Sequence, residues 1–212
     1  MSVALRHTAI LVAAALGVAA LGSAVQVASE MPGNTDRGRT VFEQSGCVRC
    51  HVPRAERQGM GPSLEDIRRP QGAFQLAGRL WNHAPAMFAA FEKEGLGWPE
   101  MRREQMTALM AYLQADPARD PAADLLQGQI VLVRKGCLKC HRLRNEGGAV
   151  GIELTRYHGG YESAVVWATT IWNHAPRMAR HAAQLGVLYP RFAGDEMANL
   201  VAFLRSLAAS TQ

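Results

Sequence analysis

The 212-residue chain contains four cysteines, and all four lie in two copies of one short motif. The copies are placed 90 residues apart and read Cys47-Val48-Arg49-Cys50-His51 and Cys137-Leu138-Lys139-Cys140-His141. A Cys-x-x-Cys-His sequence is the attachment signature for covalently bound haem. The two thiols can add to the two vinyl groups of the porphyrin, while the adjacent imidazole reaches the iron from one face. The two motifs therefore predict two covalently bound haem c groups, attached through the four cysteines, with His51 and His141 as proximal iron ligands.

Other uses of paired cysteines fit this spacing less well. Cysteine pairs that bind zinc usually lie about 15–20 residues apart. A thioredoxin-like redox pair explains one motif but has no need of a histidine at the next position in both copies. Two structural disulfides would each close a loop of only two intervening residues and would add little stability.

The N-terminus predicts export. Arg6 precedes an uncharged apolar run from Ala9 to Leu21, and small residues follow as far as Ala24. This pattern is typical of a secretory signal peptide covering residues 1–24, or of an uncleaved anchor that tethers the protein to the inner membrane. A membrane span needs about 20 apolar residues, so we expect cleavage, a periplasmic location and no transmembrane segment in the mature chain.

The charge of the chain is mildly basic. The formal net charge is +5, and removal of Arg6 with the signal leaves +4. Cationic residues occur in scattered pairs such as Arg68-Arg69, without the basic run that nucleic-acid binding requires. We expect no nucleic-acid partner and an ordinary solvated surface, with docking to an acidic protein or an anionic membrane as the alternative.

The two halves of the remaining chain are copies of one another. The segment from Leu80 to Met87 recurs from Ile171 to Met178, each time with the pattern Trp-Asn-His-Ala-Pro-x-Met. A connection with two prolines, residues 116–123, lies between the copies. The sequence therefore predicts domain 1 at residues 25–115, a linker at 116–123 and domain 2 at 124–212.

Each half closes with an apolar stripe at i, i+3, i+4 and i+7, which is typical of an amphipathic helix. The stripes are Met106, Leu109, Met110 and Leu113, and Met197, Leu200, Val201 and Leu204. No segment alternates with period two over the length of a strand. We therefore expect an all-α fold with two tandem domains, each wrapped around one haem that completes a small core.

The pattern resembles class I c-type cytochromes, and the tandem arrangement is similar to the dihaem electron carriers of the bacterial periplasm. The resemblance rests on the opening helix with Gly38, the haem motif, Gly61-Pro62-Ser63-Leu64 and the closing helix. It implies that the opening and closing helices cross where Gly38 meets Tyr112 and where Gly128 meets Phe203. It also implies that the carbonyl of Pro62 accepts a hydrogen bond from the imidazole of His51. Ile152 holds the equivalent position in the second copy.

The sixth iron ligand is not where that family usually has it. The usual methionine before a proline is replaced by Trp98-Pro99 and by Tyr189-Pro190. Outside the closing stripes, Met87 and Met178 are the methionines paired between the copies, and we predict them as distal ligands. His83 and His174 are also paired, each at an expected helix end broken by Pro85 or Pro176, and they remain the alternative. The residues alone do not decide between the two, and the resemblance favours sulfur.

Two further paired residues surround these ligands. We expect Trp81 and Trp172 to pack against the haem edge or a helix interface. Asn82 and Asn173 either orient the neighbouring ligand loop or terminate a helix.

An iron with two protein ligands has no open position, so the predicted function is electron transfer and not catalysis. The two copies differ in sequence around the haem motifs, so we expect unequal potentials. The partners would be a redox protein donor and a redox protein acceptor. The alternative to a free carrier is the cytochrome subunit of a membrane or molybdenum oxidoreductase, and the sequence does not separate the two. The enzymatic alternative is a dihaem peroxidase or a thiosulfate-oxidising enzyme, in which one iron has a displaceable ligand.

Overall fold

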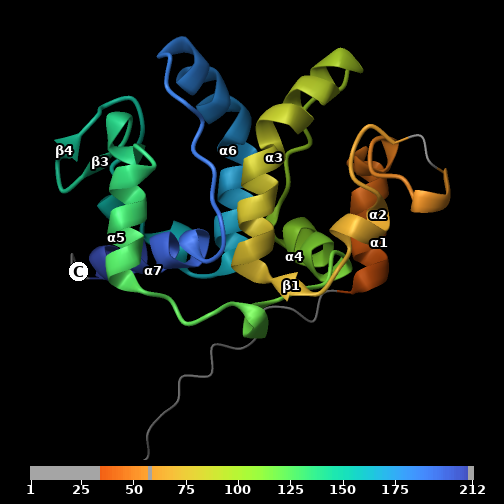
Figure 1. Ribbon diagram of the computed structural model, residues 1–212, viewed down its shortest axis with the longest axis horizontal. Coiled ribbons are helices and arrows are strands. Elements are labelled where there is room, and N and C mark those ends of the chain that lie inside the picture. The colour runs from red at the N-terminus through yellow and green to blue at the C-terminus, as the bar shows by residue number, and fades with distance from the viewer. Residues whose placement is uncertain (1–33, 57–58, 210–212) are drawn as a thin grey trace, which may run out of the picture.

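The computed structural model describes residues 34–56 and 59–209, and these fold mainly into α-helices (Figure 1). The predicted signal peptide, residues 1–24, lies outside the described residues. The α-helices are α1 Thr35–Gln44, α2 Leu64–Ile67, α3 Ala73–Lys93, α4 Arg103–Tyr112, α5 Leu125–Arg134, α6 Ala164–Gln184 and α7 Glu196–Ala209. Short 3-10 turns are η1 Cys47–Arg49, η2 Arg54–Glu56, η3 Pro117–Arg119, η4 Cys137–Lys139, η5 Leu154–Arg156 and η6 His158–Tyr161. None of the described helices has the length and apolar character to cross a membrane.

The prediction of a helical fold is confirmed, but two small β ladders depart from a purely α-helical structure. Strands β1, Gln71–Gly72, and β2, Ala115–Asp116, pair in parallel. Strands β3, Arg142–Leu143, and β4, Glu146–Gly147, pair in antiparallel fashion. Each strand has only two residues, which is too short to leave a period-two pattern in the sequence.

The opening and closing helices of each half cross where a glycine permits close contact. A Cβ added at Gly38 of α1 would meet the carbonyl oxygen of Ala108 and lie 2.5 Å from Cβ of Tyr112, both on α4. A Cβ added at Gly128 of α5 would meet α7 in the same way, 2.6 Å from Cβ of Phe203. Glycine is required at both crossings because no side chain fits there, as the resemblance implies.

The closing helices α4 and α7 bury the two predicted apolar stripes. All eight residues of the stripes are at most 4 % exposed. Val41 and Phe42 of α1 are buried in the same core, as are Val131 and Leu132 of α5. The amphipathic pattern thus identified the core face of both helices.

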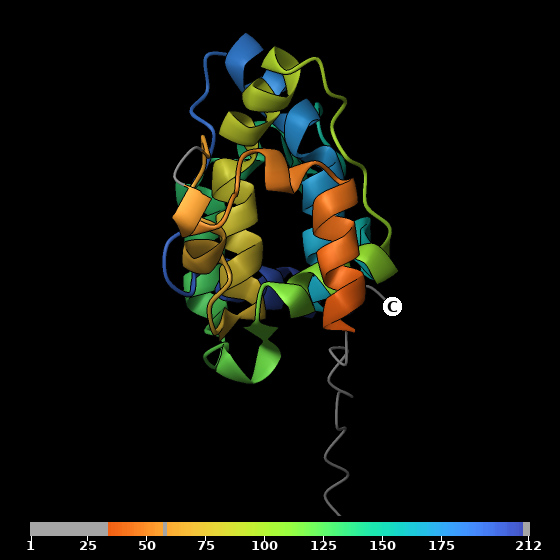
Figure 2. The same ribbon diagram turned by 90° about the vertical axis from the view of Figure 1, so that its right-hand side faces the viewer.

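Helices α3 and α6 pack side by side through the middle of the molecule, with α5 on one flank and α1 on the other (Figures 1 and 2). Each runs for 21 residues and continues through its internal proline, Pro85 or Pro176. The expectation that these prolines end the helices is therefore wrong. Packing between α3 and α6 holds the helices together across the backbone hydrogen bond that each proline removes.

The connection between the halves is fastened to the first of them. Strand β2 pairs with β1, and the carboxylate of Asp120 accepts hydrogen bonds of 3.0 and 3.1 Å from the backbone N–H of Phe74, in the first turn of α3. Helix α5 then begins with Asp124 as its N-cap, accepting from the N–H of Gln127. The two prolines of the connection thus lie in an ordered segment.

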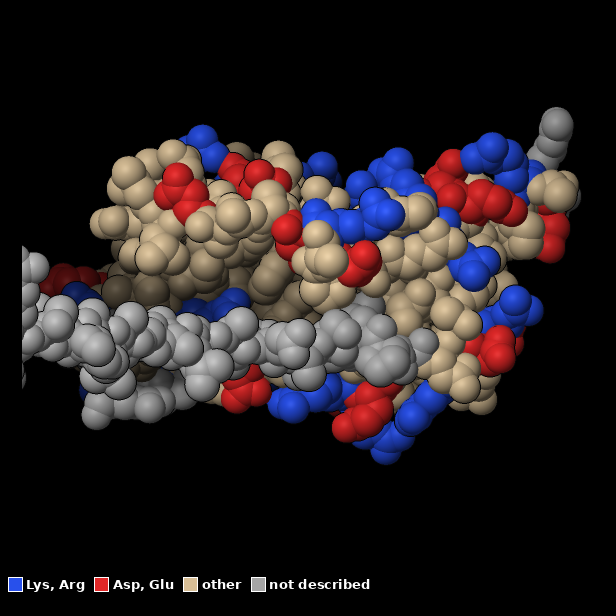
Figure 3. All heavy atoms as spheres, turned by 90° about the horizontal axis from the view of Figure 1, so that it is seen from below, with Lys and Arg blue, Asp and Glu red and all other residues tan. Residues whose placement is uncertain are grey.

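Charged side chains of both signs are interspersed over the face seen in Figure 3, as the scattered sequence distribution predicts.

One cluster of charged residues joins the first and last helices of the second half. Glu196, at the start of α7, pairs with Lys135 at 2.7 Å and with Arg134, both at the end of α5. Glu196 is half-buried, and although desolvation raises its pKa, the hydrogen bond from Lys135 and the nearby cations outweigh this and lower it.

Candidate functional site

The two cysteine motifs have the same backbone conformation. Each follows a glycine in the left-handed region, Gly46 at φ 76° or Gly136 at φ 72°, and turns into a single 3-10 helix. In each, the N–H of the histidine donates to the carbonyl of the first cysteine at 2.9 Å. The four thiols are free and partly buried. In the second half, both thiols and the imidazole line the same cavity, which is the arrangement that the motif predicts.

Burial keeps the first thiol of each pair in its neutral form. Desolvation raises the pKa of Cys47 to about 12 and that of Cys137 to about 11. A thioredoxin-like pair would instead need a thiol with a lowered pKa. In the described part of the chain, no three His, Cys, Asp or Glu side chains gather in a way that could hold a metal ion directly.

The imidazole of each motif is oriented by a backbone carbonyl. Nδ1 of His51 donates to the carbonyl of Pro62 at 2.9 Å, and Nδ1 of His141 donates to that of Ile152 at 3.1 Å. Because a carbonyl can only accept, this bond fixes the tautomer and leaves Nε2 with a free lone pair. Each histidine is therefore prepared to bind a metal through Nε2, as expected from the resemblance.

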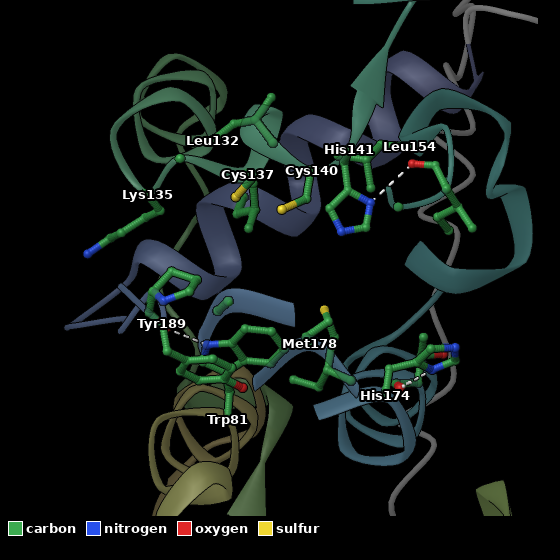
Figure 4. Close-up of a pocket in the computed structure, with 18 of the residues that line it drawn as sticks. Trp81, Leu132, Lys135, Cys137, Cys140, His141, Leu154, His174, Met178 and Tyr189 are labelled. Atoms are coloured by element: carbon green, nitrogen blue, oxygen red, sulfur yellow. Dashed lines mark hydrogen bonds between the residues drawn. The ribbon is translucent and has the colours of Figure 1, made fainter. Parts of the chain in front are cut away.

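A cavity of about 380 Å³ lies against the second motif and is lined mainly by apolar side chains. This volume is in the range of small-molecule and cofactor pockets. Cys137, Cys140 and His141 form one wall, and Met178 of α6 lies on the opposite wall. Figure 4 shows the second ring nitrogen of His141 and the sulfur of Met178 facing one another across the cavity.

The two rival distal ligands take different positions. His174 also lines the cavity, but its Nδ1 donates to the carbonyl of Thr170 on its own helix at 2.9 Å, and it lies to the side of the line between His141 and Met178 (Figure 4). His83 makes the same bond to Arg79 at 2.8 Å. Both histidines are exposed, whereas Met87 and Met178 are half-buried against the core.

The residues present fit a covalently attached haem. Two thiols lie at the edge of an apolar cavity, an imidazole with a free Nε2 enters from one wall, and a thioether faces it from the other. These are the donor types that hold haem iron in c-type sites. The described geometry of the first half repeats the same motif turn and the same imidazole bond.

The Trp-Asn pair of each half binds the other half. Asn82 of α3 forms two hydrogen bonds with the backbone of Phe192, of 2.7 and 2.8 Å. Asn173 of α6 forms two with the backbone of Met101, both of 2.9 Å. We call these contacts, together with those of Trp81 and Trp172, the reciprocal clasp.

The two tryptophans of the clasp bind the loops where class I cytochromes carry their methionine. Nε1 of Trp81 donates to the carbonyl of Pro190 at 2.6 Å, and the indole stacks on Tyr189 at 4.7 Å between centroids. Nε1 of Trp172 donates to the carbonyl of Pro99 at 2.7 Å, and its indole stacks on Trp98 at 4.3 Å. The Trp-Pro and Tyr-Pro pairs that replace the usual ligand thus have a structural role between the halves.

The proline inside α6 takes part in this clasp. Proline has no N–H, so Pro176 cannot bond to the carbonyl of Trp172 four residues earlier. That carbonyl instead accepts from Nε1 of Trp98 at 3.1 Å. The sequence predicted a haem edge or a helix interface for the tryptophans, and ligand-loop orientation or helix termination for the asparagines, but it gave no signal that their partners lie in the opposite half.

The two halves differ in polarity at one equivalent position of the central helices. In the second half, Thr170 lines the cavity and bonds to the hydroxyl of Tyr157 at 3.1 Å. The first half has Arg79 there, bonded to the buried side chain of Gln71 at 2.7 Å and paired with no carboxylate among the described residues. Desolvation and the nearby Arg69 lower the pKa of Arg79.

Residues 35–115 match the family model for cytochrome c. The match begins at α1, includes the first cysteine motif and Met87, and ends in β2. This cytochrome c domain supports a c-type cytochrome, and it implies covalent binding of haem c and a role in electron transfer. Comparison with curated proteins and with solved structures found no match.

Proposed function

We propose that the chain is an exported dihaem c-type cytochrome that carries electrons between redox partners. In this proposal Cys47 and Cys50 attach one haem, and the equivalent cysteines of the second half attach the other. His51 and His141 are the proximal ligands. The chain then consists of two tandem cytochrome c domains joined by residues 116–123.

The observation that carries the proposal is the repeated geometry of the two motifs. The second half lies outside the family match, yet His141 has the same motif turn and the same Nδ1 bond as His51. Its Nε2 is thereby directed into an apolar cavity that has Met178 on the far wall. We propose Met178 as the distal ligand of the second haem and, by the repeat, Met87 as that of the first.

The side chains explain why this site would transfer only electrons. Haem iron changes between the ferrous and ferric states and so supplies one-electron chemistry. In the second half, His141 and Met178 would hold the iron from opposite walls of the cavity, and the apolar walls would exclude water. Thioether ligation stabilises ferrous iron and raises the potential, whereas a second imidazole would lower it.

The two sites would have different potentials. The cationic Arg79 belongs to the first half, and its counterpart Thr170 is neutral. Lys135 and Arg177, in contrast, line the second cavity, so the two sites differ in the number and placement of cations, and we propose unequal potentials.

The location and partners follow from the proposed chemistry and the N-terminal pattern. Cytochrome c domains are typically exported. We propose a periplasmic location, with a redox protein as donor and another as acceptor, one of them a membrane or molybdenum oxidoreductase. Cell fractionation tests the location, and co-elution of the native protein with a large catalytic subunit on gel filtration would identify a permanent complex.

The first experiment counts the haems. Mass spectrometry and the pyridine haemochrome spectrum of denatured protein should show two covalent haems per chain. The Cys137→Ser/Cys140→Ser variant should retain one, and so should Cys47→Ser/Cys50→Ser. A single haem in the unmodified chain, or two in either variant, would refute the dihaem proposal.

The second experiment identifies the distal ligands. Met178→Ala should remove the weak far-red sulfur-to-iron charge-transfer band of one haem, and Met87→Ala that of the other. His174→Ala, four residues earlier on the same helix, is the matched control and should leave the band unchanged. Absence of the band from the unmodified protein would reassign the ligands to His83 and His174, whereas a band that survives both methionine substitutions would indicate a different methionine. Rapid binding of cyanide and turnover of peroxide by the unmodified protein would favour the peroxidase class instead.

A further inference from the structure

Trp81 lies in the wall of a cavity that belongs to the other half of the chain. It is carried by α3, between the first haem motif and Met87, and it is 7 % exposed. The cavity that it lines is the one formed by Cys137, Cys140 and His141 (Figure 4). The position of Trp81 in the sequence therefore assigns it to the first site, whereas its position in the structure assigns it to the second.

The contacts of Trp81 hold its indole in that wall. Tyr189, on which it stacks, Pro190, to which it donates a hydrogen bond, and Phe192, which it meets edge-on at 6.1 Å, all line the same cavity. Met178 lies on the same side of the cavity, opposite His141 (Figure 4). The distal wall of the second site is thus built from a tryptophan of the first half and a loop of the second.

Trp172 occupies the reciprocal position. It is 4 % exposed, and it is absent from the lining of its own half's cavity. It stacks on Trp98 and donates to Pro99, in the loop of the first half that corresponds to Tyr189-Pro190. The repeat therefore places Trp172 toward the first site as Trp81 is placed toward the second.

We propose that each haem site is completed by a tryptophan from the opposite half, Trp81 for the haem at Cys137 and Cys140, and Trp172 for the haem at Cys47 and Cys50. The indole packs on the distal side of the site and excludes water from the thioether ligand. The inference rests on the proposed function, because it requires a haem in each half. Its consequence is that the two sites are coupled, since a change in either central helix reaches the haem of the other half.

The test uses the full-length chain with one haem at a time. Trp81→Ala and Trp172→Ala are each placed in the Cys47→Ser/Cys50→Ser background, where the second haem remains, and in the Cys137→Ser/Cys140→Ser background, where the first remains. The readouts are the optical midpoint potential and the affinity for added imidazole, which competes with the methionine. Trp81→Ala should strengthen imidazole binding about tenfold, or about 1.4 kcal/mol, at the second haem and leave the first within about twofold. Trp172→Ala should do the reverse.

The inference would be refuted if Trp81→Ala altered only the first haem, which is the haem of its own half. It would also be refuted if neither substitution altered either haem. If an alanine variant does not fold, Trp81→Phe keeps a ring in the wall and removes the bond to Pro190. It should then shift the same haem in the same direction, and a shift confined to the other haem would also refute the inference. Failure of the proposed function is distinguishable, because the Cys47→Ser/Cys50→Ser protein would then carry no covalent haem.

Discussion

The hydrogen bonds of the reciprocal clasp make a quantitative prediction for Asn173→Ala. The amide of Asn173 satisfies both the N–H and the carbonyl of Met101, which is 3 % exposed. Two hydrogen bonds contribute about 2 kcal/mol in net terms, and the two buried backbone groups left unpaired raise the loss to about 4 kcal/mol. Asn82→Ala should cost less, about 2 kcal/mol, because its partner Phe192 is only half-buried and its backbone can bond to water.

Urea unfolding followed by far-UV circular dichroism and by tryptophan fluorescence measures these losses. Gln184→Ala, at the exposed end of α6, the helix that carries Asn173, is the control. Its free energy of unfolding should stay within about 0.5 kcal/mol of that of the unmodified protein. Because the clasp joins the halves, we also expect the two probes to report one coincident transition. A loss of stability below about 0.5 kcal/mol for Asn173→Ala would contradict the reasoning. So would a loss for Asn82→Ala that exceeds the loss for Asn173→Ala.

Four other substitutions have defined outcomes. Gly38→Ala should destabilise the protein by about 3 kcal/mol or prevent folding, because the added Cβ would meet the backbone of Ala108. Gly78→Ala should instead stabilise α3 by up to about 1 kcal/mol, because its Cβ would have ordinary contacts of 3.7 and 3.8 Å. Thermal unfolding measures both changes. Glu196→Gln should cost about 1–2 kcal/mol near neutral pH. Since the pKa of this carboxyl is lowered from 4.5 by folding, the difference should disappear as the pH falls through the lowered value, and a difference that persists in acid would contradict the ion pair. Arg79→Gln removes one positive charge and should lower the potential of the first haem. A unit charge about 10 Å from the iron, at an effective dielectric constant of about 20, changes the potential by about 70 mV. The potential of the second haem should be unchanged in an optical redox titration.

The sequence predicted the parts of the fold that depend on local pattern. The closing helices follow from their apolar stripes, and the crossings at Gly38 and Gly128 follow from the resemblance and are confirmed by the contacts of α1 with α4 and of α5 with α7. The motif turns were also predictable, because the residue types and their spacing define them. The short strands β1 to β4 were not, since two residues carry no periodicity.

The relation between the halves could not be predicted in the same way. Repetition of the segment from Leu80 to Met87 indicated two similar units and gave no information on which unit each side chain contacts. Pro85 and Pro176 were misread as helix ends because proline disfavours a helix interior locally, while the packing of α3 on α6 is decided by residues about 90 positions away. The sequence around Trp81 predicts a position at a haem edge or a helix interface, and the structure puts this residue in the wall of the cavity of the other half.

The reciprocal contacts of the two Trp-Asn pairs also suggest how the chain originated. Each pair contacts a loop of the opposite copy, and the two sets of contacts are equivalent under interchange of the copies. An interface of that kind is isologous, the type found between identical subunits related by a twofold axis. A shorter polypeptide with one copy of the repeat would have to form a homodimer to make the same contacts, and fusion of two such subunits end to end would give the present arrangement.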